Sequence, residues 1–365
     1  MVNICIPVRD PPKQDLQLGN LRSESRWERQ AIEACIQNPE VKNIFTWGYE
    51  WQGGSNVTPK YGGKISRTNG EHCILLMQDW NTRIATSYPW KGIIANIFHG
   101  PWLEQIPEIK NLVSVYQNKL AFTVGYPSLF NNPLAREHLL KFLSSENIIS
   151  LPVPGIPNNR FQSNFQNNTI TWAWRIIAVN TLLKAPGIIW ALNQLQQDAS
   201  LNLFILTGWE KNEVKEVMDN GEVIKINSDL STYLWSQPEM QEFLDVRNRC
   251  IVEYALDWRE VMNLYGRTKV LLNYSKQLGG PPLEAAMYGL PFVGTSYEEG
   301  VICQCPDYLV ANNEQEYIQL LNQLLTDQDF YDTTAVSYNN FAVNMYSYES
   351  FNNNLNSILK ERNLL

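Results

Sequence analysis

The chain has 365 residues, of which 44% are hydrophobic and 18% are charged, and its formal net charge is −8. This length favours about two domains, and the composition is that of an ordinary soluble globular protein rather than a disordered one. The acidic balance argues against nucleic acid as a partner, because binding its phosphates needs a basic face.

The scarce histidines and scattered cysteines argue against a metal centre. There are 6 cysteines and 3 histidines, and only Cys303 and Cys305 lie close together, without the second ligand pair of a zinc site. We therefore expect reduced, buried thiols. The N-terminus lacks the basic start and apolar core of a secretion signal, and no apolar run reaches the roughly 18 residues of a membrane span. We expect a cytoplasmic protein and leave peripheral membrane contact open.

The first half of the chain alternates short apolar runs with helical patterns, which indicates βαβ units and a parallel sheet. The predicted elements are a strand over 2–8, a helix over 24–37, and strands over 42–47, 73–77, 92–98 and 120–124. The proline-rich segment 151–157 cannot be helical, because proline removes amide donors and restricts the residue before it. We interpret this segment as an extended crossover to the second half.

The second half follows the same pattern. Strands are predicted over 169–174, 203–206, 223–226, 270–274, 291–294 and 308–310. Helices are predicted over 187–197, 258–266, 283–288, 314–325 and 346–362. Doubly wound domains bind ligands at the carboxyl ends of their strands. The pattern therefore predicts a ligand cleft between two such domains.

The segment 273–294 is the most informative one. A predicted strand ends, a glycine-proline loop follows, and a helix begins near Pro282, where proline costs no hydrogen bond. Gly279 and Gly280 let backbone amides approach an anion at this helix start. In the first helical turn, Glu284 could accept two hydrogen bonds from a ribose diol. The alternative is that Glu284 only complements the helix dipole and that the loop is a tight turn.

Residues 276–293 resemble the donor-binding signature of the retaining GT-B glycosyltransferases related to glycogen and sucrose synthases, typically Glu-Gly-Phe-Gly-x-Pro-x-x-Glu-Ala-Met-Ala-x-Gly-x-Pro-Val-Val. The resemblance assigns the donor site to Lys276, Gln277, Gly279, Gly280 and Glu284. It implies that Glu284 contacts the ribose. Lys276 stands where the family has a glutamate that contacts sugar hydroxyls. This lysine either meets a donor carboxylate or the diphosphate, or is a solvated loop residue of an unusual or inactive transferase.

Two cations resemble the arginine and lysine that follow the first strand of the family's C-terminal domain. They are Arg175, directly after the strand predicted at 169–174, and Lys184. Such cations stabilise charge on a departing nucleoside diphosphate without a metal, so the resemblance implies a catalytic role; ordinary surface cations on a helix are the alternative. Gly208 resembles a glycine turn of the family. Tyr254 resembles its base-binding segment, where it could stack on the nucleobase or simply pack half-buried.

The first half carries two weaker matches to the same family. Gly19 resembles part of the glycine-rich loop on the acceptor side. His99 resembles a histidine near the donor sugar, where it could bond a sugar hydroxyl or meet developing charge. A structural histidine is the alternative.

The resemblance implies a fold, a domain organisation and an activity for the chain. The fold is α/β of the GT-B class, two Rossmann-like doubly wound domains facing across a cleft, at 1–155 (acceptor side) and 156–340 (nucleotide sugar), with a C-terminal helix at 341–365 expected to pack back on the first domain. The activity is transfer of a sugar from a nucleotide diphosphate sugar to an acceptor hydroxyl, with retention and without metal or other cofactor. The acceptor, a glycan, lipid or natural product, is not specified by any residue. The alternatives are a non-catalytic sugar-nucleotide-binding protein and a nucleotide-sugar epimerase.

Overall fold

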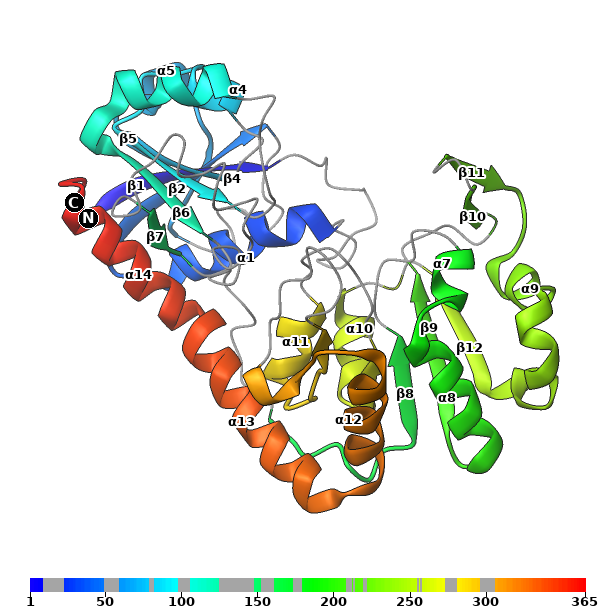
Figure 1. Cartoon of the computed structure of the whole chain (residues 1–365). Helices are drawn as coiled ribbons and strands as arrows, with labels where there is room; N and C mark the ends of the chain where they lie inside the picture. The colour runs from blue at the N-terminus through cyan, green and yellow to red at the C-terminus, as the bar shows by residue number, and fades with distance from the viewer. Residues whose placement is uncertain are drawn as a thin grey trace. The chain divides into compact units, whose positions relative to one another are not determined.

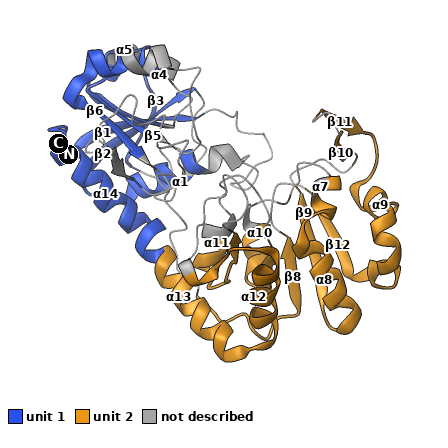
Figure 2. Ribbon diagram, in the orientation of Figure 1, with its two compact units in different colours: residues 1–157, 343–365 blue, residues 158–342 orange. Residues whose placement is uncertain are grey.

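The computed structural model describes residues 1–8, 23–48, 59–78, 82–97, 106–124, 148–151, 161–172, 179–207, 212, 214–218, 222–254, 256, 258–272, 281–295 and 306–365 (Figure 1). The chain divides into two compact units (Figure 2). Unit 1 comprises Met1–Pro157 together with Val343–Leu365, and unit 2 comprises Asn158–Ala342. The end of the chain thus belongs to the unit that its beginning builds.

Unit 1 contains a parallel sheet with the strand order β3-β2-β1-β4-β5-β6-β7. Its strands are β1 (Val2–Val8), β2 (Val41–Gly48), β3 (Tyr61–Lys64), β4 (Cys73–Gln78), β5 (Gly92–Ile97), β6 (Leu120–Val124) and β7 (Ile148–Ser150). The central strands are continuous apolar runs that are buried almost throughout, as expected for a parallel sheet covered on both faces. The strand order reverses between β1 and β4, the kind of place where doubly wound sheets bind ligands.

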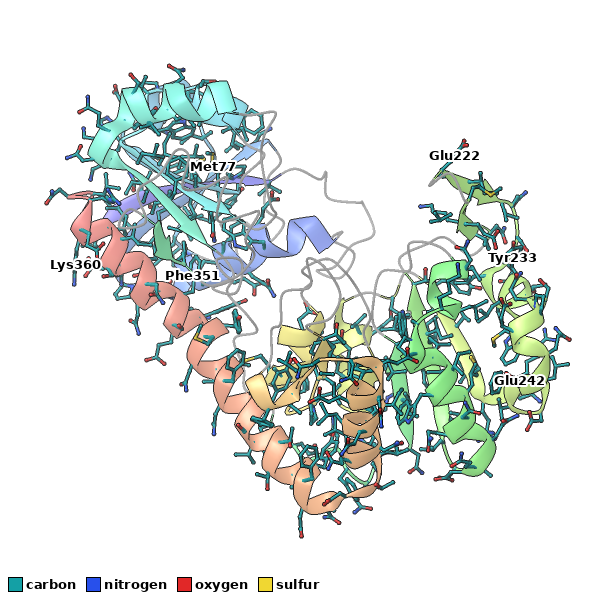
Figure 3. The ribbon with its side chains drawn as sticks, in the orientation of Figure 1. Met77, Glu222, Tyr233, Glu242, Phe351 and Lys360 are labelled. Carbon is teal, nitrogen blue, oxygen red and sulfur yellow. The ribbon has the colours of Figure 1, made fainter. Side chains whose placement is uncertain are left out.

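Helices cover both faces of the unit 1 sheet, with α4 and α5 on one face and α1 and α14 on the other (Figure 1). The described α-helices of unit 1 are α1 (Ser23–Gln37), α3 (Arg67–Gly70), α4 (Thr82–Ala85), α5 (Ile106–Tyr116) and α14 (Tyr348–Glu361). The amide of Asn352 on α14 donates to the carbonyl of Ala34 on α1 at 2.8 Å. Phe351 of α14 is fully buried (Figure 3). The C-terminal helix therefore packs on α1 within unit 1.

Unit 2 contains a second parallel sheet with the order β12-β9-β8-β13. Its strands are β8 (Thr169–Trp172), β9 (Asn202–Thr207), β12 (Cys250–Tyr254) and β13 (Val270–Leu272). A parallel pair, β14 (Gly294–Thr295) and β15 (Val310–Ala311), is connected to the sheet by a bridge between Leu271 and Phe292. An antiparallel hairpin is formed by β10 (Val214–Val217) and β11 (Val223–Ile226).

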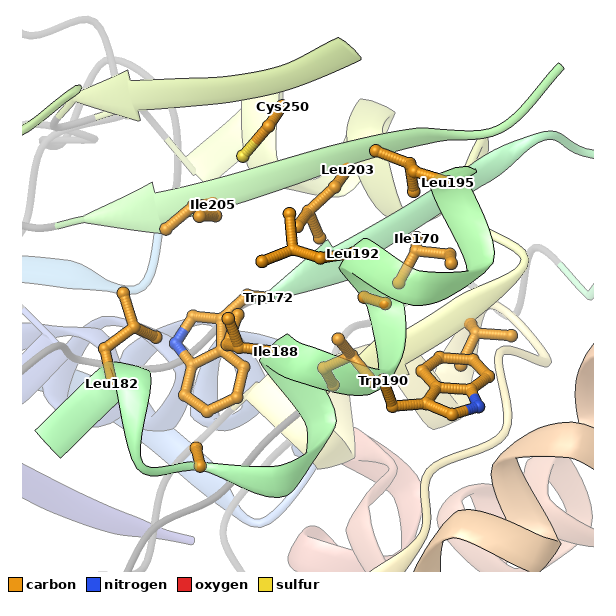
Figure 4. Packing of buried hydrophobic residues seen from close by; sticks show 14 of the residues in the cluster. Ile170, Trp172, Leu182, Ile188, Trp190, Leu192, Leu195, Leu203, Ile205 and Cys250 are labelled. Atoms are coloured by element: carbon orange, nitrogen blue, oxygen red, sulfur yellow. The ribbon is translucent and has the colours of Figure 1, made fainter. Parts of the chain in front are cut away.

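The described helices of unit 2 are α7 (Val179–Leu183), α8 (Pro186–Gln197), α9 (Leu230–Trp235), α10 (Trp258–Tyr265), α11 (Pro281–Met287) and α12 (Glu314–Thr326), with 3₁₀ helices at Pro238–Arg249 and Asp307–Leu309. Helix α13 (Gln328–Tyr346) belongs to unit 2 up to Ala342. The core forms where α8 packs on the sheet (Figure 4). Ile188, Leu192 and Leu195 recur at helical spacing and are buried against Ile170 and Leu203. This amphipathic pattern is what makes the segment a helix that covers a sheet.

Three of the predicted strands differ from the structure. Of residues 291–294, Phe292 forms only an isolated bridge, and the strand begins at Gly294. Residues 223–226 form a strand, but in an antiparallel hairpin with β10 rather than in the parallel sheet. Residues 308–310 are mostly the 3₁₀ helix Asp307–Leu309, and the strand begins only at Val310. All three segments are short, and periodicity alone does not decide the bounds, the partner or the type of so short an element.

Candidate functional site

The donor-signature segment places α11 directly after the sheet of unit 2. Strand β13 ends at Leu272, and α11 begins at Pro281, with proline in the first turn where its missing amide costs nothing. Glu284 also lies in this first turn and is only 4% exposed. Burying a carboxylate costs free energy unless it accepts hydrogen bonds. The buried position of Glu284 therefore indicates a specific role rather than that of a solvated surface charge.

The C-terminal end of α11 is capped by a Schellman motif. The amide of Leu290 donates to the carbonyl of Ala285 at 3.1 Å. The amide of Gly289 donates to the carbonyl of Ala286 at 2.9 Å. These are the two bonds that satisfy the last carbonyls of a helix, and they require a left-handed residue, which Gly289 supplies with φ of 68°. A Cβ at Gly289 would lie 2.5 Å from Cδ2 of Phe161, so the ring of Phe161 closes this end of the helix.

The β10–β11 hairpin follows β9, and polar side chains tie it to two helices. The amide of Asn180 on α7 donates to the carbonyl of Val217 at 2.6 Å and accepts from the amide of Val217 at 3.3 Å. On α9, the hydroxyl of Tyr233 donates to Oε1 of Glu216 at 2.7 Å. One asparagine side chain thus pairs with the free edge of β10 as a further strand would.

Tyr254, at the end of β12, is half-buried and holds the start of α9. Its hydroxyl donates to Oδ2 of Asp229 at 3.0 Å and accepts from the amide of Ser231 at 3.1 Å. The other oxygen of Asp229 caps α9 by accepting from the amide of Thr232 at 2.9 Å. Burial raises the pKa of Tyr254, and its ring packs against the core of unit 2. The hydroxyl is therefore structural, and stacking of the ring on a nucleobase stays a prediction.

Removing the hydroxyl of Tyr254 tests this structural role. We expect Tyr254→Phe to lower the free energy of unfolding by about 1–2 kcal/mol, because Asp229 and the amide of Ser231 lose a part-buried partner. Denaturant unfolding measures the change. Tyr308→Phe is the control, because Tyr308 is 49% exposed, and it should change stability by less than about 0.5 kcal/mol. Equal stability of both variants would contradict the assignment.

The structure describes three of the predicted site residues. Glu284 is buried on α11, Tyr254 is half-buried at the end of β12, and Lys184 is exposed between α7 and α8. The others lie outside the described residues: Gly19, His99, Arg175, Gly208, Lys276, Gln277, Gly279 and Gly280. The roles given to these residues stay predictions.

The sequence does not identify the residues that support α11 and the β10–β11 hairpin. Phe161 and Asn180 contact segments far away in the sequence. For Asn180, the only local signal is a polar residue in an otherwise apolar run, which does not name its partner.

Cysteine and metal chemistry give no further candidate among the described residues. Cys5, Cys35, Cys73 and Cys250 are buried free thiols, as predicted. Burial raises the pKa of Cys35 to about 12 and that of Cys73 to about 11. Within the described ranges, no group of three or more His, Cys, Asp or Glu side chains could hold a metal ion. No described helix combines the length and apolar character needed to cross a membrane.

The fold is similar to that of solved glycosyltransferases. HepE of Anabaena, in complex with UDP-glucose, has a TM-score of 0.60 at 10% identity, over 99% of this chain and 100% of that chain. A glycosyltransferase from Rickettsia africae has a TM-score of 0.59 at 11% identity, over 98% of both chains.

TarM of S. aureus has a TM-score of 0.53 at 13% identity over 81% of this chain; the chain spans only 55% of TarM. No family model matches the chain, and no curated protein matches its sequence. The similarity in structure nevertheless confirms the predicted fold class: the chain has the α/β fold of the GT-B glycosyltransferases.

Proposed function

We propose that this protein is a glycosyltransferase that moves a sugar from a nucleoside diphosphate sugar to an acceptor hydroxyl. One observation carries the proposal: within the segment that resembles the donor signature, residues Pro281–Met287 form α11, with Glu284 buried in its first turn. The same fold occurs in HepE, which was solved with UDP-glucose. The sequence signature and its place in the fold therefore support one another.

The chemistry of donor binding follows from this placement. A carboxylate that accepts two hydrogen bonds suits the vicinal hydroxyls of a ribose. The N-terminal end of α11 favours negative charge, which suits the diphosphate. Arg175 and Lys184 would stabilise the charge that grows on the leaving diphosphate. Retention of anomeric configuration and independence of a metal ion belong to the same proposal, and they rest on the family resemblance.

Lys276 gives the proposal a donor class. An ammonium group cannot accept the hydrogen bonds of sugar hydroxyls that a glutamate accepts. It can pair with a carboxylate, so we propose a donor sugar that carries an acid group, such as a uronic acid. A nucleoside diphosphate uronate would then bind more tightly than its neutral counterpart.

A thermal-shift assay with UDP-glucuronate and UDP-glucose tests both the binding of a nucleotide sugar and the donor class. A ligand that binds the native state raises the melting temperature. We expect a shift with both donors and a larger one with the uronate. Lys276→Gln should reduce the difference between the donors, and Lys276→Glu should abolish the response to the uronate through repulsion. Lys360→Glu is the control, because Lys360 is exposed on α14 of unit 1 (Figure 3). Equal responses of wild type and both Lys276 variants would reject the donor class. No shift with either UDP sugar, nor with UDP, GDP, ADP or dTDP, would count against the proposed function.

A further inference from the structure

Helix α11 is held at its last turn by a side chain from α13. Asn339 of α13 is 4% exposed, and its Nδ2 donates to the carbonyls of Ala286 and Met287 at 3.1 and 3.3 Å. The last carbonyls of a helix have no partner within the helix. Asn339 supplies a donor to the carbonyl of Met287 and a second donor to that of Ala286, which also accepts from Gly289 in the Schellman motif. Asn339 lies more than fifty positions away from both in the sequence.

The position of Asn339 is otherwise suited to an apolar residue. The buried face of α13 is formed by fully buried aromatic and small side chains: Tyr331, Ala335, Tyr338 and Ala342. An amide placed among such residues costs free energy unless it is hydrogen-bonded. The two bonds to α11 help to offset that cost, and they give a reason for an asparagine at this place.

Fixing the last turn of α11 also fixes its first turn. The helix spans only Pro281–Met287, and so short a helix is not stable by itself but depends on tertiary contacts. Ala286 and Met287 lie within one helical turn of Glu284. A shift of the carbonyls that Asn339 holds would therefore move the carboxylate of Glu284.

We propose that Asn339 is a positioning residue for donor binding: it fixes α11 so that Glu284 meets the ribose of the donor. This inference rests on the proposed function. The bonds of Asn339 to Ala286 and Met287 would act on the donor through α11 and Glu284.

The affinity for UDP, measured by titration calorimetry, tests the inference. Asn339→Leu keeps the approximate size of the side chain but removes the donor, and it should raise the Kd for UDP by about fivefold to tenfold, the equivalent of one lost hydrogen bond. Asn352→Leu is the matched control. Asn352 is 8% exposed, and its Nδ2 donates to the carbonyl of Ala34 in unit 1. It should lose a similar amount of stability while the Kd for UDP stays within about twofold of wild type.

Two further variants separate positioning from a loss of stability. Asn339→Gln retains an amide donor on a longer side chain, and it should keep most of the UDP affinity even where the extra methylene lowers the melting temperature. Asn339→Ala removes the donor without adding volume, and it decides the question if Asn339→Leu does not fold.

The outcomes distinguish this inference from the proposed function. If wild type binds UDP and Glu284→Ala weakens that binding, but Asn339→Leu and Asn339→Ala bind UDP as wild type does, then the positioning role is wrong and the proposed function stands. If Asn352→Leu weakens UDP binding as much as Asn339→Leu, the effect is general destabilisation, and the positioning role is again wrong. If wild type binds none of UDP, GDP, ADP and dTDP, the proposed function fails and this inference fails with it.

Discussion

Glu284→Ala should raise the Kd for UDP by roughly tenfold to a hundredfold, because hydrogen bonds to a charged group contribute about 1.5–3 kcal/mol. The carboxylate is buried, and it is the acidic group of the first turn of α11. Glu284→Gln should lie between wild type and Glu284→Ala, because an amide oxygen still accepts a hydrogen bond but carries no charge. Titration calorimetry with UDP measures all three proteins.

The control for Glu284 separates ligand binding from the helix dipole. Glu260 lies in the first turn of α10, another helix of unit 2, and is exposed. If Glu284 only complements the dipole of α11, both Glu284→Ala and Glu260→Ala should cost a few tenths to about 1 kcal/mol of stability and leave UDP binding unchanged. Loss of stability in Glu284→Ala with unchanged UDP affinity would reject the contact with the ribose.

Gly289→Ala should be clearly destabilising, with an expected loss of about 1–3 kcal/mol in the free energy of unfolding. Two costs add. The left-handed φ of 68° is unfavourable for any residue with a Cβ, and the new Cβ would lie 2.5 Å from the ring of Phe161. The Schellman motif at the end of α11 would have to give way. Denaturant unfolding monitored by tryptophan fluorescence measures the change.

Gly266→Ala is the control for this prediction. Gly266 follows α10, and a Cβ there would have its nearest neighbour at 3.6 Å, an ordinary contact. We expect its stability to stay within about 1 kcal/mol of wild type. Adding Phe161→Ala to Gly289→Ala should restore part of the loss by removing the clash, but not the part due to φ. Wild-type stability of Gly289→Ala would contradict the cap described for α11.

Local sequence predicts much of the fold where a strand is central. For β1, the predicted bounds agree with the structure, because a central parallel strand is apolar on both faces and reads as an uninterrupted run. The edge strand β3 has the sequence Tyr-Gly-Gly-Lys, and the edge strand β12 is only half-buried along most of its length. Neither carries such a run, and neither was predicted. Helix α13 was also missed, because its buried positions are tyrosines and alanines rather than a stripe of leucines.

In the candidate site, too, residues with local roles can be predicted from the sequence and residues that act from a distant segment cannot. Glu284 and the start of α11 could be predicted, because proline, glycine and glutamate act within one turn and their roles are local. Asn339 and Phe161 could not, because each supports α11 from a distant part of the chain. A single sequence does not say which segments meet, and the residues that position a site are often those that meet it only through folding.

The most direct test of the proposed function is acceptor-dependent release of UDP. Wild type and Glu284→Ala are incubated with the UDP sugar that gives the larger thermal shift, with and without a panel of glycan, lipid and natural-product hydroxyls, and free UDP and the product masses are recorded. The proposed function predicts that wild type releases UDP only with an acceptor, that the acceptor gains the mass of one sugar residue, and that Glu284→Ala is slower at limiting donor. UDP release without any acceptor product, or conversion of the donor into an isomer without acceptor, would contradict glycosyl transfer.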